Sequence, residues 1–403
     1  MRILFAAAPG HGLLLPVVPL VWAARAAGHE VLLATSGDAV DVGARAGLPA
    51  VDVFPGRDLW RDLMGLVKGA EPVEDLPEEY VRAASTGNPF GLFALTMTEG
   101  TLQAGRAFDA DLVVHTSDHP AGELAASALG VPVLEVGNRI SWSVRDGGFG
   151  IEPLVGNEII RSLREKLALP DSGPRVLARI DPRPPSMGGL AEGAPNAGAT
   201  EDGPVEDGAP WWPMRYVPFN GGAEVPEWAR ESPERPRICV TLGTVVPKMT
   251  GIGTLSAVLD ALAAIDVEVV LAGGDADFSD LGELPANVRS VNFLPLSVFL
   301  PTCSLIVHHG GSGTTAAPLH YAVPQLVLPT FADNPMSAQR VVDRGVGLSH
   351  DPAELDVATV RDLVRRLLDE PQFARAAREV AAEMADQPSP AAVLDRVERA
   401  LAN

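Results

Sequence analysis

The most constraining feature of this sequence is a glycine-rich loop between an apolar strand and a helix. The apolar residues Leu305-Ile306-Val307 are typical of a buried strand, and Ala316–Ala322 is typical of a helix. The segment between them reads His308-His309-Gly310-Gly311-Ser312-Gly313-Thr314-Thr315. Glycines let backbone N–H groups approach a ligand, and the start of a helix adds unpaired donors and the positive end of a dipole. The loop therefore predicts a phosphate or diphosphate site with His309 as a further donor, the alternative being a tight turn with a hydrogen-bonded histidine.

The next apolar strand leads into a polar pair. Residues 324–329 are apolar apart from one glutamine, and Asp333 and Asn334 follow shortly after them. Ligands of open parallel sheets bind at the carboxyl ends of the strands. We therefore expect this carboxylate and this amide to lie at the same edge as the glycine-rich loop.

The charge of the chain restricts its partners. The 403 residues include 52 Asp and Glu against 31 Lys and Arg, a formal net charge of −21. Such a charge disfavours nucleic acid and anionic membrane surfaces as partners. An anionic ligand would have to be held by local dipoles and a few side chains.

The cysteines and the N-terminus indicate a soluble, cytoplasmic protein. Cys239 and Cys303 lie in apolar segments without metal-ligand spacing, which favours buried thiols in a reducing compartment. Pro9-Gly10-His11-Gly12 interrupts the apolar N-terminal run, which is atypical of a signal peptide. The apolar residues 13–24 are too few to span a bilayer.

Both halves of the chain alternate strands and helices. In the first half we expect strands at 3–7, 30–34, 112–115 and 131–136 and helices at 17–27 and 122–129. In the second half we expect strands at 237–243, 267–272 and 288–294, a helix at 255–265 and closing helices at 359–368, 373–384 and 391–401. This rhythm predicts two α/β domains, each built on a parallel sheet covered on both faces.

The segment between the halves has a different composition. From Gly188 to Arg235 the chain is rich in Gly, Pro and Ala and holds nine acidic residues against three basic ones. Such a stretch buries little apolar surface, so residues 190–210 are predicted to form a mobile acidic loop. Trp211-Trp212-Pro213 then returns the chain to a packed surface. We expect an N-terminal domain over residues 1–215 and a C-terminal domain over residues 216–388.

With these residues in view, the chain resembles the GT-B-fold glycosyltransferases of antibiotic biosynthesis. The likeness spans nearly the whole chain and is strongest at residues 19–31, 212–220 and 241–347, which include the glycine-rich loop and Asp333-Asn334. The resemblance implies two Rossmann-like parallel-sheet domains that face each other across a cleft, the first binding the acceptor and the second the donor. It also implies a C-terminal helix, residues 389–403, that packs back on the N-terminal domain. Enzymes of this family move a deoxysugar from a dTDP-sugar to a polyketide or similar aglycone.

The resemblance assigns the donor contacts to the second domain. Phe293 would stack on the nucleotide base, next to Leu294, although a core phenylalanine is the alternative. Thr244 would contact the diphosphate opposite His309. Asp333 and Asn334 match the pair that bonds the sugar hydroxyls, where the amide is more often Gln. The remaining diphosphate contacts would come from the N–H groups around Gly311, Ser312, Gly313 and Thr314.

One position favours dTDP over UDP. Relatives with ribonucleotide donors often carry a Glu eight residues after the phosphate histidine, where it bonds the ribose hydroxyls. This chain has Ala317 there. A deoxyribose has no 2′-hydroxyl to satisfy, so the resemblance implies a dTDP-sugar as co-substrate.

The usual catalytic pair of the family is missing. Its base is a His three residues before a Pro or Gly in the first loop, and counting back from Pro16 gives Leu13. The position of the acidic partner, after the strand at 112–115, holds Thr116.

Four alternatives remain for the acceptor proton. His11, in the same loop, has an ordinary pKa of about 6.5 that suits a base. Asp118 or His119 would supply the base from the neighbouring loop. A phenol, enol or thiol acceptor would ionise readily and need little help. In the fourth alternative the protein binds without catalysing.

The acceptor should bind in an apolar cleft of the first domain. Each side chain that we expect near the carboxyl-end edge of its sheet has ordinary packing as its alternative role. These side chains are Trp60, Met64, Phe90, Phe93, Met97 and Trp142.

The sequence thus predicts an inverting, metal-independent glycosyltransferase of the hexosyltransferase type, with a dTDP-deoxysugar donor, an apolar small-molecule acceptor and no cofactor. Metal independence is inferred because no Asp-x-Asp pair lies near the phosphate loop. A non-catalytic binding or helper protein is one alternative, and a transferase that forms a C-, N- or S-glycosidic bond is another. A homodimer and a requirement for an auxiliary protein both remain open alternatives.

Overall fold

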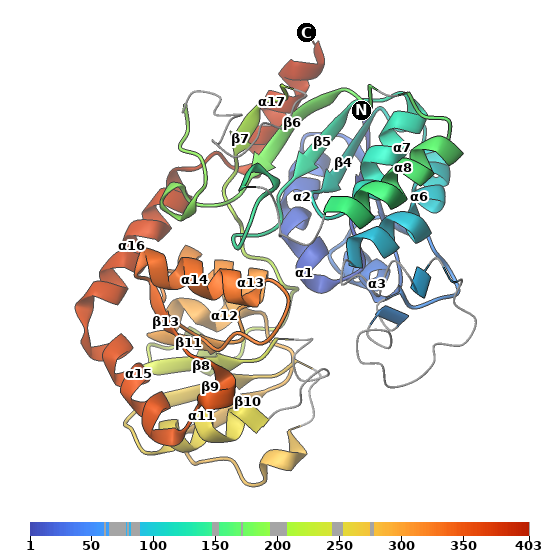
Figure 1. The fold of residues 1–403 in the computed structure, drawn as a ribbon. Coiled ribbons are helices and arrows are strands. Elements are labelled where there is room, and N and C mark those ends of the chain that lie inside the picture. The colour runs from blue at the N-terminus through green and yellow to red at the C-terminus, as the bar shows by residue number, and fades with distance from the viewer. Residues whose placement is uncertain are drawn as a thin grey trace.

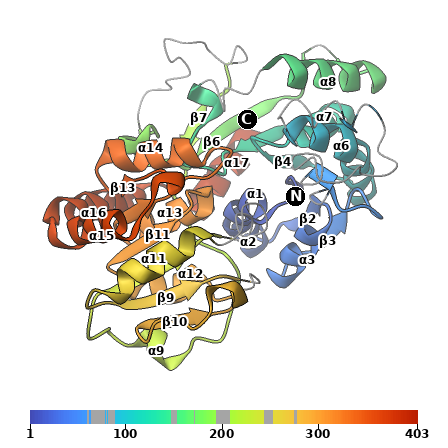
Figure 2. The ribbon, with the colours of Figure 1, turned by 60° about the horizontal axis from the view of Figure 1, so that its bottom comes forward.

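Two parallel sheets, one in each half of the chain, form the framework of the molecule (Figure 1). The computed structural model describes residues 1–59, 62–63, 78, 80–81, 89–146, 153–170, 172–193, 208–243, 253–274 and 278–402. Helices flank both sheets in the described parts of the chain (Figure 2). The predicted fold class, two Rossmann-like α/β domains, is confirmed.

The first sheet has the strand order β3-β2-β1-β4-β5-β6-β7, and every neighbouring pair is parallel. The strand order reverses between β1 and β4, and ligands of open sheets bind at such a switch point. The strands are β1 Arg2–Ala6, β2 Glu30–Thr35, β3 Ala50–Asp52, β4 Leu112–Thr116, β5 Val133–Val136, β6 Val176–Asp181 and β7 Trp211–Pro213.

The second sheet has the order β10-β9-β8-β11-β12-β13 and is also parallel throughout. Its switch point lies between β8 and β11, so the glycine-rich loop after β11 stands beside it. The strands are β8 Arg237–Thr241, β9 Glu268–Ala272, β10 Val288–Val291, β11 Leu305–His308, β12 Gln325–Val327 and β13 Gly347–Ser349.

Most of the described helices lie between consecutive strands, while the last three follow the last strand, β13. Those of the first half are α1 His11–Leu14, α2 Val18–Ala26, α3 Asp38–Arg45, α6 Pro89–Phe108, α7 Pro120–Leu129 and α8 Pro153–Lys166. Those of the second half are α9 Glu227–Arg230, α11 Gly253–Ala263, α12 Leu296–Phe299, α13 Ser312–His320, α14 Asn334–Arg344, α15 Val357–Asp369, α16 Pro371–Asp386 and α17 Pro390–Ala402. In the described parts of the chain, no helix combines the length and apolar character needed to cross a membrane.

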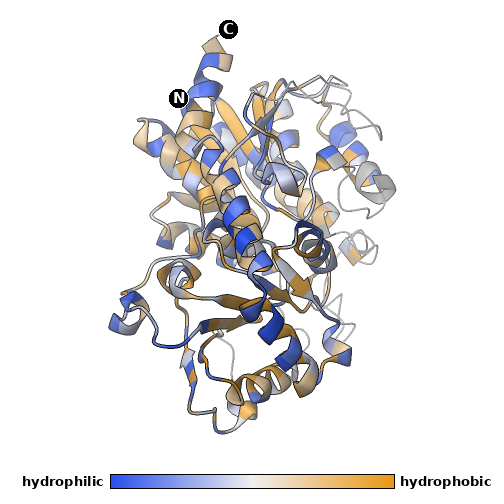
Figure 3. Cartoon of the chain, turned by 90° about the vertical axis from the view of Figure 1, so that its left-hand side faces the viewer, coloured by the Kyte–Doolittle hydropathy of each residue, from blue (hydrophilic) through white to orange (hydrophobic). Residues whose placement is uncertain are grey.

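Each sheet is buried because apolar side chains leave its strands on both faces. Phe5 of β1 packs with Val21 of α2 and Val397 of α17 on one face, while Leu4 packs with Met97 of α6 on the other. The strands carry apolar colour and the outer turns of the helices carry polar colour in Figure 3. This pattern follows from the hydrophobic effect, because successive residues of a strand point to opposite faces and both faces are covered.

Two elements differ from their predicted bounds in ways that affect the site. The helix after the glycine-rich loop begins at Ser312, four residues earlier than the predicted 316–322. The strand predicted over 288–294 ends at Val291, so Phe293 and Leu294 lie in the loop after β10. Of the predicted acidic loop at 190–210, residues 194–207 lie outside the described residues.

An apolar cluster joins the two halves. Ile140 and Met187, from the loops after β5 and β6, are buried with Leu319 of α13, Val341 of α14 and Met384 of α16. The last helix then returns to the first half of the chain. There α17 packs against α2, and the His29 Nε2 atom lies 2.7 Å from a Glu398 carboxylate oxygen.

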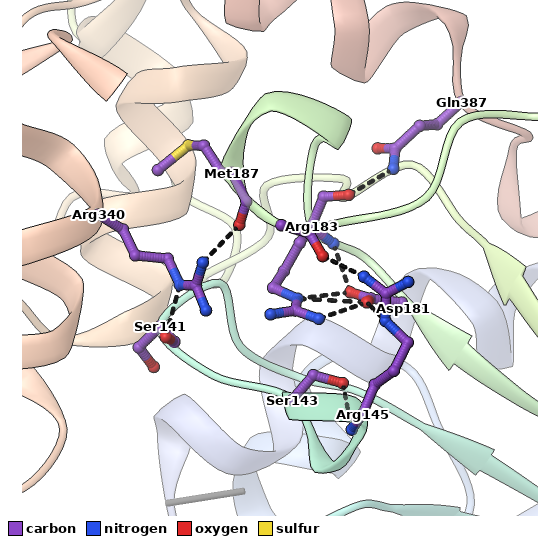
Figure 4. A network of polar contacts seen from close by, with 9 residues as sticks. Ser141, Ser143, Arg145, Asp181, Arg183, Met187, Arg340 and Gln387 are labelled. Carbon is purple, nitrogen blue, oxygen red and sulfur yellow. Dashed lines mark hydrogen bonds and ion pairs between the residues drawn. The ribbon is translucent and has the colours of Figure 1, made fainter. Parts of the chain in front are cut away.

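A polar network extends this junction (Figure 4). The guanidinium of Arg183 is fully buried and donates to Asp181 Oδ2 at 2.7 Å, while the Arg145 Nε atom lies 3.6 Å from the same carboxylate oxygen. The Gln387 side-chain amide donates to the Arg183 carbonyl at 2.8 Å. Removing one member of a buried ion pair would leave the charge of the other uncompensated, so the Arg183–Asp181 pair is held together. Through the Gln387 hydrogen bond, this pair fixes the chain after β6 against the end of α16.

Candidate active site

The glycine-rich loop forms a concentrated set of backbone donors at the switch point of the second sheet. The Thr315 amide donates to the Gly311 carbonyl at 2.9 Å, the first backbone bond within α13. The amides of Ser312, Gly313 and Thr314 precede this bond, so they have no acceptor inside the helix. Their N–H groups and the positive end of the helix dipole suit an anion.

His309 is held between two glycines. An added Cβ would lie 2.3 Å from His309 Nε2 at Gly311 and 2.5 Å from Cε1 at Gly243, far below normal contact. The two glycines therefore make room for the imidazole. Gly243 also has φ +67°, a conformation that favours glycine.

His309 is neutral at neutral pH. Burial lowers its pKa to about 4, although the charge of Asp333 and the backbone of Thr241 act in the opposite direction. The Nδ1 atom is buried and has no hydrogen-bond partner among the described residues. A neutral imidazole carries one N–H, and in the tautomer that places it on Nδ1 the ring offers a donor to a ligand oxygen.

The neighbouring His308 has a structural role. Its Nδ1 atom accepts from the Gly310 amide at 3.1 Å, so its Nε2 atom carries the proton and donates to the Gln325 side-chain oxygen at 2.8 Å. Both ring nitrogens are therefore used inside the fold. Of this pair, only His309 has a ring nitrogen without a hydrogen-bond partner among the described residues.

Asp333 and Asn334 lie against the glycine-rich loop. A Cβ at Gly310 would come within 3.0 Å of the Asn334 carbonyl, and the Asn334 amide donates to Thr330 Oγ1 at 3.1 Å. Asp333 is the N-cap residue of α14 but makes no capping bond with its side chain. Its carboxylate instead accepts hydrogen bonds from the first domain.

Those hydrogen bonds come from Arg139 and Ser141 in the loop after β5, two residues that no sequence motif singled out. The Ser141 hydroxyl donates to Asp333 Oδ2 at 2.6 Å, and Arg139 Nη1 donates to the same oxygen at 3.1 Å. Arg139 Nη2 also donates to Asp118 Oδ2 at 2.6 Å, so one guanidinium joins carboxylates of both domains. Burial lowers the pKa of Arg139, but the charges of Asp118 and Asp333 and the bonds to them raise it further.

Asp118 is fully enclosed by donors of its own domain. The Thr116 hydroxyl donates to Oδ1 at 2.6 Å and the Asn138 amide donates to Oδ2 at 2.9 Å. The same amide reaches the Leu13 carbonyl at 3.1 Å. Leu13 and Thr116, the positions where the family's catalytic pair was expected, therefore border one polar cluster around Asp118.

The two candidate histidines of this domain differ in access. His11 is exposed at the start of α1. This helix lies on the side of the first domain that faces the second (Figures 1 and 2). His119 is fully buried, and neither ring nitrogen has a partner among the described residues. Burial lowers the pKa of His119 to about 3, so its imidazole is neutral.

The aromatic candidates also separate. Phe293 is 49% exposed, and Gly221 lies so close that a Cβ there would come within 2.9 Å of its ring. Phe293 is therefore a surface residue, not a core one, whereas the adjacent Leu294 packs on a buried cluster. Trp142 is buried and Phe90 is half-buried, with the Arg139 guanidinium 5.2 and 5.6 Å from their ring centres.

Some candidates are placed away from any surface or are not described. Phe93 and Met97 are completely buried in the core beneath α6, which matches their packing alternative. Trp60, Met64 and Thr244 lie outside the described residues.

Comparisons with known proteins agree along the whole chain. The family described as erythromycin biosynthesis protein CIII-like, N-terminal domain, matches residues 22–243, and erythromycin biosynthesis protein CIII-like, C-terminal domain, matches residues 256–400. The chain is 38% identical to elloramycin glycosyltransferase ElmGT of Streptomyces olivaceus over 411 residues, which cover 99% of this chain and 97% of the relative. It is 31% identical to 10-deoxymethynolide desosaminyltransferase of Streptomyces venezuelae over 447 residues, with 99% and 97% covered.

Solved structures show the same architecture. The glycosyltransferase SnogD from Streptomyces nogalater superimposes with a TM-score of 0.80 at 35% identity, covering 100% of this chain and 99% of that one. SsfS6 of Streptomyces sp. SF2575, complexed with thymidine diphosphate, gives a TM-score of 0.77 at 32% identity with 99% of each chain covered. By these matches and by the fold and site described above, the chain belongs to the erythromycin biosynthesis protein CIII-like family of glycosyltransferases and has the GT-B fold.

Proposed function

We propose that the protein is an inverting, metal-independent transferase that moves a deoxysugar from a dTDP-sugar to the aglycone of a natural product, of polyketide type. The observation that carries the proposal is the cradle around His309. A neutral imidazole and three helix-start amides meet at the switch point of the second sheet. Donors of this kind stabilise the negative charge that develops on a diphosphate leaving group.

The choice of donor and acceptor is supported by the relatives and by one residue. The structure of SsfS6 was solved with thymidine diphosphate, and the relative from Streptomyces venezuelae is named 10-deoxymethynolide desosaminyltransferase. Ala317, buried in α13, offers no group to a ribose 2′-hydroxyl. The names of the relatives include aglycones and sugars of antibiotics, which supports an apolar natural-product acceptor.

We propose His11 as the base that takes the acceptor proton. It is exposed at the domain-facing side of the first sheet, whereas both oxygens of Asp118 already accept hydrogen bonds and His119 is enclosed. Attack from the His11 side, opposite the diphosphate held by α13, would invert the anomeric carbon. Asp118, His119 and an acceptor that ionises unaided remain the alternatives.

The same proposal divides the chain by role. Residues 1–215 would bind the acceptor, residues 216–388 the donor, and residues 389–403 would tie the second domain back to the first. The division is supported by β7 in the first sheet and β8 in the second. We place the reaction in the cytoplasm, with Phe90 and Trp142 as acceptor contacts and Phe293, Asp333 and Asn334 as donor contacts.

Calorimetry with dTDP tests the donor site. We expect the wild type to bind dTDP and the His309→Ala variant to bind it about 10- to 100-fold more weakly, the range for a hydrogen bond to a charged group. His350→Ala, beyond the edge strand β13, is the matched control and should bind like the wild type. No heat with millimolar dTDP would contradict the proposal.

A turnover assay separates the enzyme from a non-catalytic binding protein. That alternative is favoured by Leu13 and Thr116 at the expected base positions. We expect the protein to transfer the sugar of a dTDP-deoxysugar to an aromatic polyketide aglycone. This transfer should persist when EDTA removes divalent metal ions. A protein that binds dTDP but transfers nothing to any of a panel of hydroxyl, thiol and carbon acceptors would fit the helper alternative instead.

A further inference from the structure

Asp333, the proposed contact to the donor sugar, is held by the opposite domain. Ser141 Oγ and Arg139 Nη1 both donate to one carboxylate oxygen, Oδ2, at 2.6 and 3.1 Å. Neither reaches Oδ1. The carboxylate is thereby fixed in rotation about its Cβ–Cγ bond, and among the described residues no hydrogen bond occupies Oδ1.

The two donors are themselves immobilised. The Ser141 carbonyl accepts from Arg340 Nε at 2.8 Å, and Arg340 Nη1 donates to the Met187 carbonyl at 3.0 Å (Figure 4). Arg340 belongs to α14, the helix that Asp333 begins. Ser141 is therefore tied to Asp333 at the start of α14 and to Arg340 within α14. These two contacts fix Ser141 beside the helix start.

Arg139 is restrained from the other side. Asp118 accepts from Nη2 at 2.6 Å, and the rings of Phe90 and Trp142 flank the guanidinium. Only about a tenth of the Arg139 side chain is exposed. A planar guanidinium held between two carboxylates and two rings has little freedom, so it can set the direction of Asp333 Oδ1.

We propose that Arg139 and Ser141 are positioning residues for the donor sugar: by holding Oδ2 of Asp333 they direct Oδ1 toward a sugar hydroxyl. The inference rests on the proposed function, since it takes Asp333 as the sugar contact. It makes donor-sugar recognition a property of both domains. Substitutions in the acceptor-side loop after β5 then change the affinity for the sugar without touching the nucleotide.

A purely structural role for these bonds would give a different result. The contacts would then hold the domains together, and their loss would lower stability and weaken dTDP and dTDP-sugar binding alike. The affinity for dTDP-glucose relative to that for dTDP is therefore the deciding quantity. It isolates the contribution of the hexose.

Calorimetry with dTDP and with dTDP-glucose on the full-length protein tests the proposal. Ser141→Ala removes a donor without removing a charge, and we expect dTDP-glucose affinity to fall about 3- to 10-fold while dTDP affinity stays within about twofold. Arg139→Gln should lower dTDP-glucose affinity about tenfold or more. Ser141→Thr keeps the hydroxyl and should restore most of the affinity.

Ser143→Ala is the matched control in the same loop. The Ser143 hydroxyl accepts from the Arg145 amide at 3.2 Å and has no role in the proposed sugar site, so both affinities should stay unchanged. Thermal melting of each variant checks that it folds. If Arg139→Gln fails to fold, Ser141→Ala and Ser141→Thr still decide the question.

The outcomes separate this inference from the proposed function. Unchanged dTDP-glucose affinity in Ser141→Ala overturns the inference, as does an equal loss for both ligands. A wild type that binds dTDP and dTDP-glucose alike overturns it too, with the nucleotide site intact. A wild type that binds neither ligand overturns the proposed function itself.

Discussion

The molecule contains two glycine-rich loops in comparable places, and they differ in what surrounds them. One follows β11 and holds His309, which is buried between Gly243 and Gly311. The other follows β1 and holds His11, which is exposed on a helix of four residues. A Cβ at Gly12 would meet no atom within 4 Å. A similar local sequence thus surrounds a buried histidine in one domain and an exposed histidine in the other, because Gly243 and Gly311 close around His309 whereas His11 begins a short helix at the surface.

Replacing His11 should have the largest effect and tests the open edge. We expect His11→Ala to lower turnover about 10²- to 10⁴-fold, the usual contribution of a general base, while dTDP affinity stays within about twofold. Steady-state kinetics together with calorimetry measure both quantities. Full activity in this variant would move the base elsewhere, and Asp118→Asn would then be the next variant to assay.

Acid should destabilise the protein through its buried histidines. The pKa values of His119 and His308 are about 3 and that of His309 about 4, all below the ordinary value of about 6.5. Burial thus makes the unfolded chain bind protons more strongly, so the stabilising contribution is complete above about pH 6.5 and is lost as the pH falls toward the folded pKa values of about 3 to 4. At pH 5 we expect a loss of about 2 kcal/mol for each such histidine.

Urea unfolding at pH 7 and pH 5 measures this loss. His309→Gln should reduce the pH dependence by the share of one histidine. An equal pH dependence in the wild type and in this variant would show that His309 is not buried as a neutral group.

The glycines should tolerate substitution unequally. Gly311→Ala forces a methyl group against the His309 ring, and we expect dTDP affinity to fall about tenfold, as overpacking of one to three kcal/mol would give. Gly12→Ala meets open space and lies in α1, so affinity and turnover should change less than about twofold. Comparable losses in the two variants would contradict the contrast between the loops.

The sequence was sufficient for features that depend on neighbours along the chain. Short apolar runs predicted β1, β4, β8 and β11, and the glycine-rich loop predicted that a helix follows, although this helix begins four residues earlier than expected. The local signal was weaker for short strands. Two short strands, Ala50–Asp52 and Trp211–Pro213, form because each pairs with a longer neighbouring strand. The local sequence does not indicate this pairing.

The part of the site that joins the domains was not predictable in this way. Arg139 and Ser141 meet Asp333 across 194 and 192 residues of sequence, so neither residue has a local partner that reveals its role. One signal was present: Asn138 and Arg139 follow β5 after a single glycine, where polar residues meet the ligand-binding edge of a parallel sheet. Acidic and amide residues at other strand ends were recognised as candidate ligand contacts. The role of Arg139 becomes visible only in the fold, because its two carboxylate partners are far away in the sequence.

The smallest expected effect concerns the aromatic residues of the two domains. Phe293→Ala should weaken dTDP binding about 3- to 10-fold, since aromatic stacking contributes about 0.5–1.5 kcal/mol and the ring is half exposed. Phe293→Trp keeps a flat ring and should retain most of the affinity. Thermal stability should change little in either variant, because the ring buries little area. Phe93→Leu, within the core beneath α6, should do the reverse and lower stability while dTDP affinity persists. If Phe293→Ala binds dTDP like the wild type, the thymine ring does not stack on Phe293, and the diphosphate cradle alone positions the nucleotide.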